Sequence, residues 1–500
     1  MTDWCLFLRP LAAACSLIML AGCTTSTMPI SMDERQKALP EQRLALVQHQ
    51  EPLSGPVSLE EALARALKYN LDSRVKLMEE ALAMRQFDLS RVDLLPRLTM
   101  AAGYTSRNND LASSSEDYAT GEQSLVPSIS SERQRSVVDL GLSWNVLDLG
   151  VSYYQSRQNA DRLLVAQERR RKTVHQVMQQ VRQAYWQMVG AQMMEKPLQG
   201  IISDARKALA DSRKVQAERL VSPMETLGYQ RQLLEIIRQL ESVNDELSQA
   251  RPRLASLMNM EPGVSFEVVV PENRQIHRLT MSLEQVEEAA LLNRPELMEA
   301  RYNERIGVLE TRKAMARLMP GIEFSVGTHY DSNDFLVNKS WRDAGLRVSW
   351  NLLNVLNAPA IMGAAKAQEE LAHHQHMALS MAVLTQSHVA YRDYRGRLGQ
   401  HELAQELNQI EQQILEQTRN ATRTDMQSRL QEVRAAASAL VAELRDHHSY
   451  ASLQVAYGQL LATIGWDPLP AEVERRDLAG LRESLHETDA RWVRQLGGGP

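Results

Sequence analysis

Four short stretches of the chain alternate between apolar and polar residues. In residues 139–146 every second side chain is apolar, and residues 346–352 repeat the pattern. Alternation with a period of two predicts β-strands that have one apolar and one polar face. Strands of about ten residues with an apolar outer face are typical of membrane β-barrels, although a soluble sandwich with one buried face gives the same pattern. The apolar positions are Leu98, Met100, Ala102, Tyr104, Leu140, Leu142, Trp144, Val146, Ile322, Phe324, Val326, Leu346, Val348, Trp350 and Leu352.

Most of the remaining chain has helical periodicity. The two longest helical patterns cover about residues 152–221 and 359–423, and each would reach roughly 100 Å at 1.5 Å per residue. Helices of that length without a domain-sized core imply a coiled-coil assembly. Pro197 is expected to break or kink the first of them. Further helices are predicted over residues 59–94, 223–260 and 282–319, from the second long helix to 463, and after 470.

The chain contains the same pattern twice. Ser58 and the capping-box residue Glu61 return as Ser282 and Gln285, an offset of 224. Residues 143–148 (SWNVLD) return as 349–354 (SWNLLN), an offset of 206. Two offsets imply two homologous halves, of which the first carries extra residues in the polar loop between its strands. We expect an α+β fold with two repeats.

The first residues indicate export and lipid attachment. Residues 11–20 form an apolar run too short to span a bilayer, as in a secretory signal. The run leads into Leu20-Ala21-Gly22-Cys23, which resembles the lipobox of bacterial lipoproteins. That resemblance implies cleavage before Cys23 and its acylation, palmitate included. The other cysteines, Cys5 and Cys15, lie inside the signal, so the mature chain would have no internal disulfide.

Composition excludes several classes of function. A net charge of −6 without a basic block makes nucleic acid an unexpected partner, and no apolar run after the signal is long enough for a transmembrane helix. The sequence has no phosphate loop, no HExxH and no dinucleotide fingerprint, so we expect no enzyme activity and no cofactor. His373, His374 and His376 lie on a polar helix and are interpreted as surface residues, so no metal site is expected.

Taken together, these features resemble the TolC-type outer-membrane efflux family. They are the lipobox, the two repeats, the SLEEAL opening at Ser58, the Leu95-Pro96 step into a strand, SWNVLD and the paired long helices. Four strands cannot close a barrel alone, since known barrels begin at about eight. The resemblance implies a homotrimer whose subunits share a twelve-stranded barrel that continues into a long periplasmic α-helical barrel. It also implies a passive exit duct that serves an inner-membrane pump of RND, ABC or MFS type through a periplasmic adaptor.

The resemblance also directs attention to the helix turns farthest from the membrane. Residues 219–225 and 421–427 form these turns, and in the family acidic residues just after such turns constrict the aperture. The gate candidates are Asp425, Arg423, Gln427 and Glu225; Gln427 stands where the family has an aspartate. Ordinary helix-terminal charges are the alternative. The expected adaptor-docking residues at the turns are Leu220, Val221, Ser222, Thr422 and Thr424.

The predicted domain organisation follows from these assignments. The expected location is the outer membrane of a Gram-negative cell, with a lipid anchor and a periplasmic extension. The alternative function is a lipid-anchored structural or adhesive coiled coil without a pore. The boundaries are a signal at 1–22, a lipidated linker at 23–57, a first repeat at 58–263 with a β-hairpin at 97–147, a second repeat at 264–469 with a β-hairpin at 321–353, and a polar tail at 470–500.

Overall fold

A computed structural model describes most of the chain in two units, Met1–Pro52 and Leu53–Pro500. In the first unit, helix α2 (Met32–Val47) begins at a capping box in which Ser31 and Glu34 bond each other's backbone. Cys23 lies outside the described residues. The structure describes residues 28–48, 50–124, 126–218, 222–261, 263–271, 274, 276–421, 426–467 and 477–496.

In the second unit, the segment before each strand pair forms two helices instead of one. Residues 59–94 form α3 (Leu59–Tyr69) and α4 (Leu71–Val92) rather than the single helix expected. Asn70 leaves the helical conformation at ψ 127°, and its side chain caps α4 by accepting from the Ser73 amide.

The segment before the second strand pair, β5 and β6, also forms two helices. It forms α8 (Leu283–Asn293) and α9 (Pro295–Ala316), separated by Arg294 at ψ 129°. Here the cause is Pro295, which disfavours the helical conformation of the residue before it. The single helix expected over 282–319 was therefore also wrong.

The long helices are confirmed, but the expected break at Pro197 is wrong. Helix α5 (Val146–Ala217) continues through Pro197 for 72 residues. Met194 and Leu198 on either side are buried against α6 (Pro223–Ser248) and α12 (Met426–Ile464), and this packing holds the helix together across the proline. The other helices are α7 (Ala250–Leu257), α10 (Leu352–Leu356), α11 (Ala358–Ala421, 64 residues) and α13 (Leu478–Leu496).

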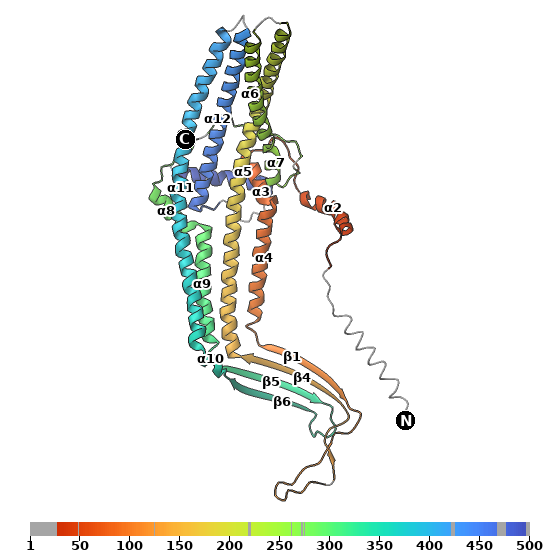
Figure 1. The fold of residues 1–500 in the computed structure, drawn as a ribbon. Coiled ribbons are helices and arrows are strands. Elements are labelled where there is room, and N and C mark those ends of the chain that lie inside the picture. The colour runs from red at the N-terminus through yellow and green to blue at the C-terminus, as the bar shows by residue number, and fades with distance from the viewer. Residues whose placement is uncertain are drawn as a thin grey trace. The chain divides into compact units, whose positions relative to one another are not determined.

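The four expected strands form one antiparallel sheet in the order β1-β4-β5-β6 (Figure 1). The strands end earlier than the alternation suggested, because Asn145 and Asn351 turn to cap the helices that follow. Their bounds are β1 (Arg97–Ser106), β4 (Gln134–Asn145), β5 (Gly321–Asp331) and β6 (Ser340–Ser349), and the loop after β1 carries a small hairpin of β2 (Ala112–Ser113) and β3 (Ser128–Ile129).

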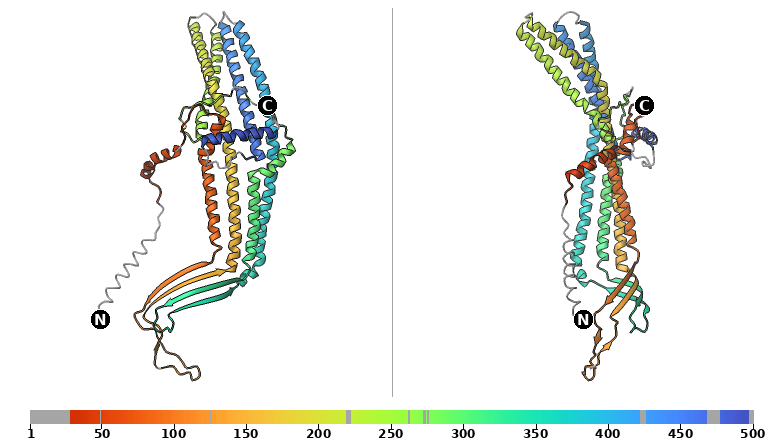
Figure 2. Two further views of the ribbon diagram at one scale, coloured as in Figure 1. Left: turned by 180° about the vertical axis from the view of Figure 1, so that it is seen from behind. Right: turned by 90° about the vertical axis from the view of Figure 1, so that its right-hand side faces the viewer.

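The helices pack in two tiers beyond the sheet (Figure 1). Next to the sheet, α5 and α11 pack with α4 and α9; farther away they pair with α6 and α12 as two antiparallel hairpins. Where the tiers meet, α3 and α13 lie across α5 (Figure 2). The largest buried cluster lies there, with Leu63, Tyr185, Leu254 and Leu481 among its members. No described helix is both long and apolar enough to cross a lipid bilayer.

Candidate functional site

One face of the sheet is apolar and exposed. Leu98 pairs with Leu142, which pairs with Val326, and Trp144 pairs with Phe324, which pairs with Leu346. Directly paired residues share a face of a sheet, so the apolar positions form one continuous surface. Exposed fractions are 72 % at Met100, 68 % at Leu98 and 65 % at Leu346. Such a patch on a single subunit marks a surface that contacts lipid or another protein.

The opposite face carries a charged cluster centred on His329 in β5. Its Nδ1 lies 2.6 Å from Oδ1 of Asp139 in β4, and its Nε2 lies 3.3 Å from Oδ1 of Asp343 in β6. The imidazole stacks on Trp341, with ring centroids 5.1 Å apart. Gly327 gives it room, because a Cβ there would lie 2.5 Å from Nε2 of His329. The pattern of strand residues predicted the polar face but not this cluster.

The helix turns predicted as the gate are only partly described. Ser222 precedes α6, which has Pro223 at its first position, and the Thr226 hydroxyl donates to the Ser222 carbonyl at 3.0 Å. Glu225 and Gln427 lie in α6 and α12, but their side chains are outside what is described. The other predicted residues of these turns lie outside the described residues, so the gate and the docking turns stay predictions. They are Leu220, Val221, Thr422, Arg423, Thr424 and Asp425.

The described parts of the two helical hairpins are joined by polar contacts. Gln230 donates to Gln216 at 2.8 Å within the first hairpin, and Arg419 lies 3.7 Å from Glu432 within the second. Arg434 of α12 donates to Gln232 of α6, which connects the hairpins to each other. The contacts of Arg419 and Arg434 are exposed, so each stabilises the arrangement only weakly.

Where the tiers meet, a buried ionic cluster connects α12 to the segment before α8. Arg274 donates to Asp446 at 2.6 Å and to Nδ1 of His447 at 2.7 Å. Burial, and then the Arg274 guanidinium, lowers the pKa of His447 to about 4, so the imidazole is neutral at pH 7. Sequence reasoning missed this cluster; the signal was the polar run 446–449 in an otherwise apolar stretch of α12.

Two histidines of α11 share a single acid. His373 and His376 each place Nδ1 2.8 Å from an oxygen of Glu304 in α9. Side-chain hydrogen bonds from His373 and His376 lower the pKa of Glu304. Among the described residues, no group of three or more histidine, cysteine or acidic side chains is placed to hold a metal ion.

Comparison with known proteins identifies this architecture. Residues 62–260 match the model of the family described as outer membrane efflux protein. No curated protein sequence matches the chain.

Solved outer-membrane channels share the fold. The structure is similar to the outer-membrane channel OprN (TM-score 0.63, 17 % identity, 81 % of this chain and 89 % of that one). It is also similar to the CmeC outer membrane channel of Campylobacter jejuni (0.67, 13 %, 93 % and 97 %) and to the MtrE channel of Neisseria gonorrhoeae (0.58, 16 %, 80 % and 88 %). The resemblance seen in the sequence is thus confirmed: residues 62–260 match the outer membrane efflux protein family, and the chain has the fold of solved outer-membrane channels.

Proposed function

We propose that the protein is the outer-membrane exit duct of a tripartite efflux or secretion system. It conducts substrates passively from an inner-membrane pump and a periplasmic adaptor to the exterior. The observation that carries this proposal is a sheet with an exposed apolar face and a charged opposite face that leads directly into helices of 72 and 64 residues. A lipid-facing wall and a tunnel long enough to cross a periplasmic gap are what such a duct requires.

The sheet supports assembly of several copies into one barrel. Within the four-stranded sheet, β1 and β6 are the edges, and each has ten residues. In a bilayer every backbone group must be paired, so these edges need partners. All neighbouring pairs are antiparallel, so β6 of one copy can continue onto β1 of the next in the same pattern. Three copies give a closed barrel of twelve strands, as the family resemblance implies.

Matching backbone geometry supports the two repeats. Asn70 and Arg294, which are 294 − 70 = 224 positions apart, have almost the same dihedral angles (φ −60°, ψ 127° and φ −64°, ψ 129°). Asn259 and Gly465, which are 465 − 259 = 206 positions apart, both have positive φ (59° and 77°). The offsets equal those of the sequence repeat.

The remaining assignments complete the proposal. Acylation of Cys23 anchors each subunit in the outer membrane, since an acyl chain holds a protein at a membrane surface without spanning it. Asp425 and Glu225 form acidic rings at the periplasmic aperture, Gln427 lies beside them, and Arg423 ties neighbouring helices in the closed state. The turns around Ser222 and Thr422 receive the adaptor. The duct itself is not an enzyme, because the partner pump supplies the energy.

The test is the native mass and the conductance of the full chain extracted from outer membranes in mild detergent. We expect a mass of three acylated subunits and a steady ion conductance in planar bilayers. A monomer that stays stable without detergent after removal of its acyl chains, and that forms no pore, would overturn the duct and favour the anchored coiled coil.

A further inference from the structure

Arg274 connects the segment between the two halves of the chain to helix α12. This segment, residues 264–281, joins α7 to α8, and its described part is called the linker here. The Arg274 guanidinium donates to Asp446 at 2.6 Å and to Nδ1 of His447 at 2.7 Å. It also lies over the Tyr450 ring, 5.5 Å from the centroid. Asp446 and His447 are 5 % and 8 % exposed, so Arg274 joins the linker to a buried site on α12.

The linker is also held on both sides of Arg274. Before it, the Val268 amide donates to Gln192 of α5 at 2.8 Å, and the Gln192 side chain donates back to the Val268 carbonyl at 3.0 Å. After it, His277 stacks on Tyr457 of α12, with ring centroids 4.7 Å apart. Loss of the Arg274 contact would therefore free only the part of the linker between these two anchors.

The Arg274 contact depends on a neutral His447. A neutral imidazole has one nitrogen that accepts a hydrogen bond, whereas an imidazolium has only donors. Protonation of His447 therefore removes the acceptor and places a second positive charge 2.7 Å from a guanidinium that keeps its own proton. While the contact is formed, burial, and then the guanidinium, hold the pKa of His447 at about 4.

The neighbouring titratable groups respond to acid in the same direction. His401 of α11 places Nδ1 3.6 Å from Oδ1 of Asp446, and burial lowers the pKa of this imidazole despite the nearby Asp446 and Glu402 carboxylates. A protonated His401 competes with Arg274 for Asp446. Burial raises the pKa of Glu443, and its protonation removes an acid that attracts Arg274.

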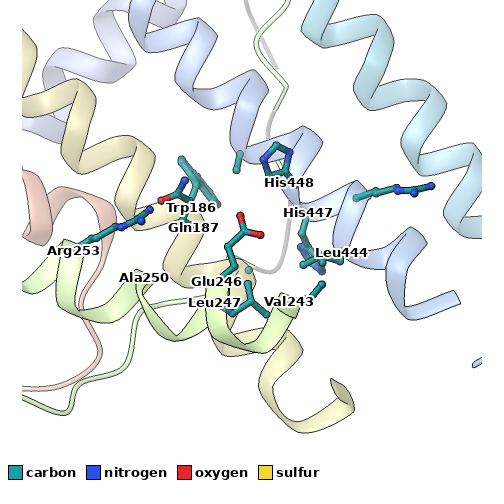
Figure 3. A pocket seen from close by; sticks show the side chains of 13 residues that line it. Trp186, Gln187, Val243, Glu246, Leu247, Ala250, Arg253, Leu444, His447 and His448 are labelled. Atoms are coloured by element: carbon teal, nitrogen blue, oxygen red, sulfur yellow. The ribbon is translucent and has the colours of Figure 1, made fainter. Parts of the chain in front are cut away.

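His447 also lines a pocket of about 220 Å³ between α5, α6, α7 and α12. Figure 3 shows the Glu246 side chain of α6 reaching into the space between Trp186 of α5 and His447. The pocket gives an imidazolium room for water and an acidic neighbour once Arg274 has left. The other charged or titratable groups that line it are Arg253 of α7 and Arg445 and His448 of α12, whereas α5 contributes Trp186, Gln187 and Gly190, which do not titrate.

We propose that Arg274 is an acid-released latch, which ties the linker to α12 at neutral pH and lets it go when His447 is protonated. Neither the family match nor the structural similarities assign a role to this contact. The release itself does not depend on the proposed duct. In the duct it gives α12, whose far end carries the predicted gate, more freedom in acid, and that consequence rests on the proposed function.

The experiment is limited proteolysis of the full-length protein in mild detergent with papain, which is active at both pH values used. A cut within residues 264–281 separates the two halves of the chain, and its rate follows the population of the released linker. A released imidazole has a pKa of about 6.5, against about 4 in the latched state. Protonation of His447 should therefore make release about thirtyfold more favourable at about pH 5 than at about pH 7.5.

The decisive quantity is the ratio of the parent's cleavage rate to that of His447→Gln at the same pH, because the activity of the protease then cancels. Glutamine keeps an acceptor for Arg274 but does not titrate, so we expect this ratio to rise about thirtyfold between about pH 7.5 and pH 5. His448→Gln, which changes the exposed neighbour, is the matched control, and the parent's ratio to it should stay constant. Arg274→Met, which has no guanidinium, should be cleaved rapidly at both pH values.

Three results would overturn the latch. A constant ratio of parent to His447→Gln would show that His447 does not control the linker. An equal change with His448→Gln would assign the effect to the rim of the pocket. Loss of the parent's native mass before cleavage would mean that the whole assembly comes apart in acid.

Bilayer conductance of the same preparations separates the latch from the duct. A conducting protein with a constant cleavage ratio overturns the latch alone. A protein that forms no pore but shows the thirtyfold rise supports the latch and overturns the duct.

Discussion

His329 and Asp139 are direct cross-strand partners on the charged face of the sheet, with Nδ1 2.6 Å from Oδ1. On the other side of β5, Oδ1 of Asp343 in β6 lies 3.3 Å from Nε2 of His329. One imidazole therefore lies between two carboxylates. In a barrel of three subunits this cluster repeats three times around the lumen, so it contributes directly to the field that a passing ion meets.

Removing the imidazole should make the duct more selective for cations. In His329→Ala, Asp139 and Asp343 lose the donor that lies between them. An uncompensated carboxylate at about 8 Å in water changes an ion's energy by about 0.5 kcal/mol, so we expect the cation-to-anion permeability ratio to rise roughly twofold. The measurement is the reversal potential in a KCl gradient. His374→Ala, which removes an exposed histidine of α11, is the control, and an equal shift in both variants would contradict the assignment.

A methyl group at Gly327 should have the same electrical effect without unfolding the protein. A Cβ there would lie 2.5 Å from Nε2 of His329 and 2.8 Å from Oδ1 of Asp343, which are both ends of flexible side chains. We expect Gly327→Ala to displace the imidazole, to lower stability by less than about 1 kcal/mol, and to shift the reversal potential as His329→Ala does. The double variant should show no further shift, and additive shifts would mean that the two positions act separately.

The elements of this fold were largely predictable because their patterns are local. Alternation identified all four strands and both faces of the sheet, as the pairing of Leu142 with Val326 confirms. Helix lengths were also correct in outline. The division at Arg294 could have been predicted from Pro295, whereas the division at Asn70 depends on a capping side chain that also donates to the distant Leu257 carbonyl.

The errors and omissions arose where distant segments decide the outcome. Pro197 has a strong local tendency to break a helix, yet the packing of its neighbours Met194 and Leu198 against α6 and α12 overrides it. The contact between Arg274 and Asp446 joins residues 172 positions apart, which no local pattern reveals. The proposed closure of a barrel depends on other copies of the chain, so no pattern within one subunit can show it.

Stability should fall as the pH drops from about 6.5 towards 4. Burial lowers the pKa of folded His447 to about 4, whereas an unfolded imidazole keeps a pKa of about 6.5. The unfolded chain therefore binds a proton that the folded chain does not, which costs about 2 kcal/mol of stability at about pH 5. Burial also lowers the pKa of His175 to about 4, with the same consequence.

The measurement is the Tm at about pH 7.5 and pH 5. His447→Gln keeps an acceptor for Arg274 but cannot titrate, so the pH-dependent loss should shrink by the contribution of His447, while those of the other buried histidines, His175, His277 and His401, remain. His448→Gln, which changes the exposed neighbour, is the control and should leave the loss unchanged. A His447→Gln protein with the parent's pH profile would contradict the role of the buried imidazole.

The proposed acidic ring at the helix turns makes a separate prediction about the aperture. Three copies of Asp425 brought together by symmetry attract cations and repel one another. We expect Asp425→Ala to lower the cation preference roughly twofold and to raise the conductance of the resting duct. Glu416→Ala, an exposed acid on α11, is the control. Unchanged conductance and selectivity would make Asp425 an ordinary helix-terminal charge.

The end of α12 should tolerate no side chain at Gly465. This residue has φ 77°, which costs an L-residue about 1–2 kcal/mol. A Cβ there would also lie 2.7 Å from the backbone nitrogen of Arg294 and the carbonyl carbon of Asn293, which cannot rotate away. We expect Gly465→Ala to lower the unfolding free energy by more than about 2 kcal/mol, measured by denaturant unfolding. Gly200→Ala, in α5 with nothing within 4 Å of the new Cβ, should stabilise the helix by up to about 1 kcal/mol. If both variants unfold at the parent's midpoint, the junction between α8, α9 and α12 relaxes freely and does not fix the helices of the second half.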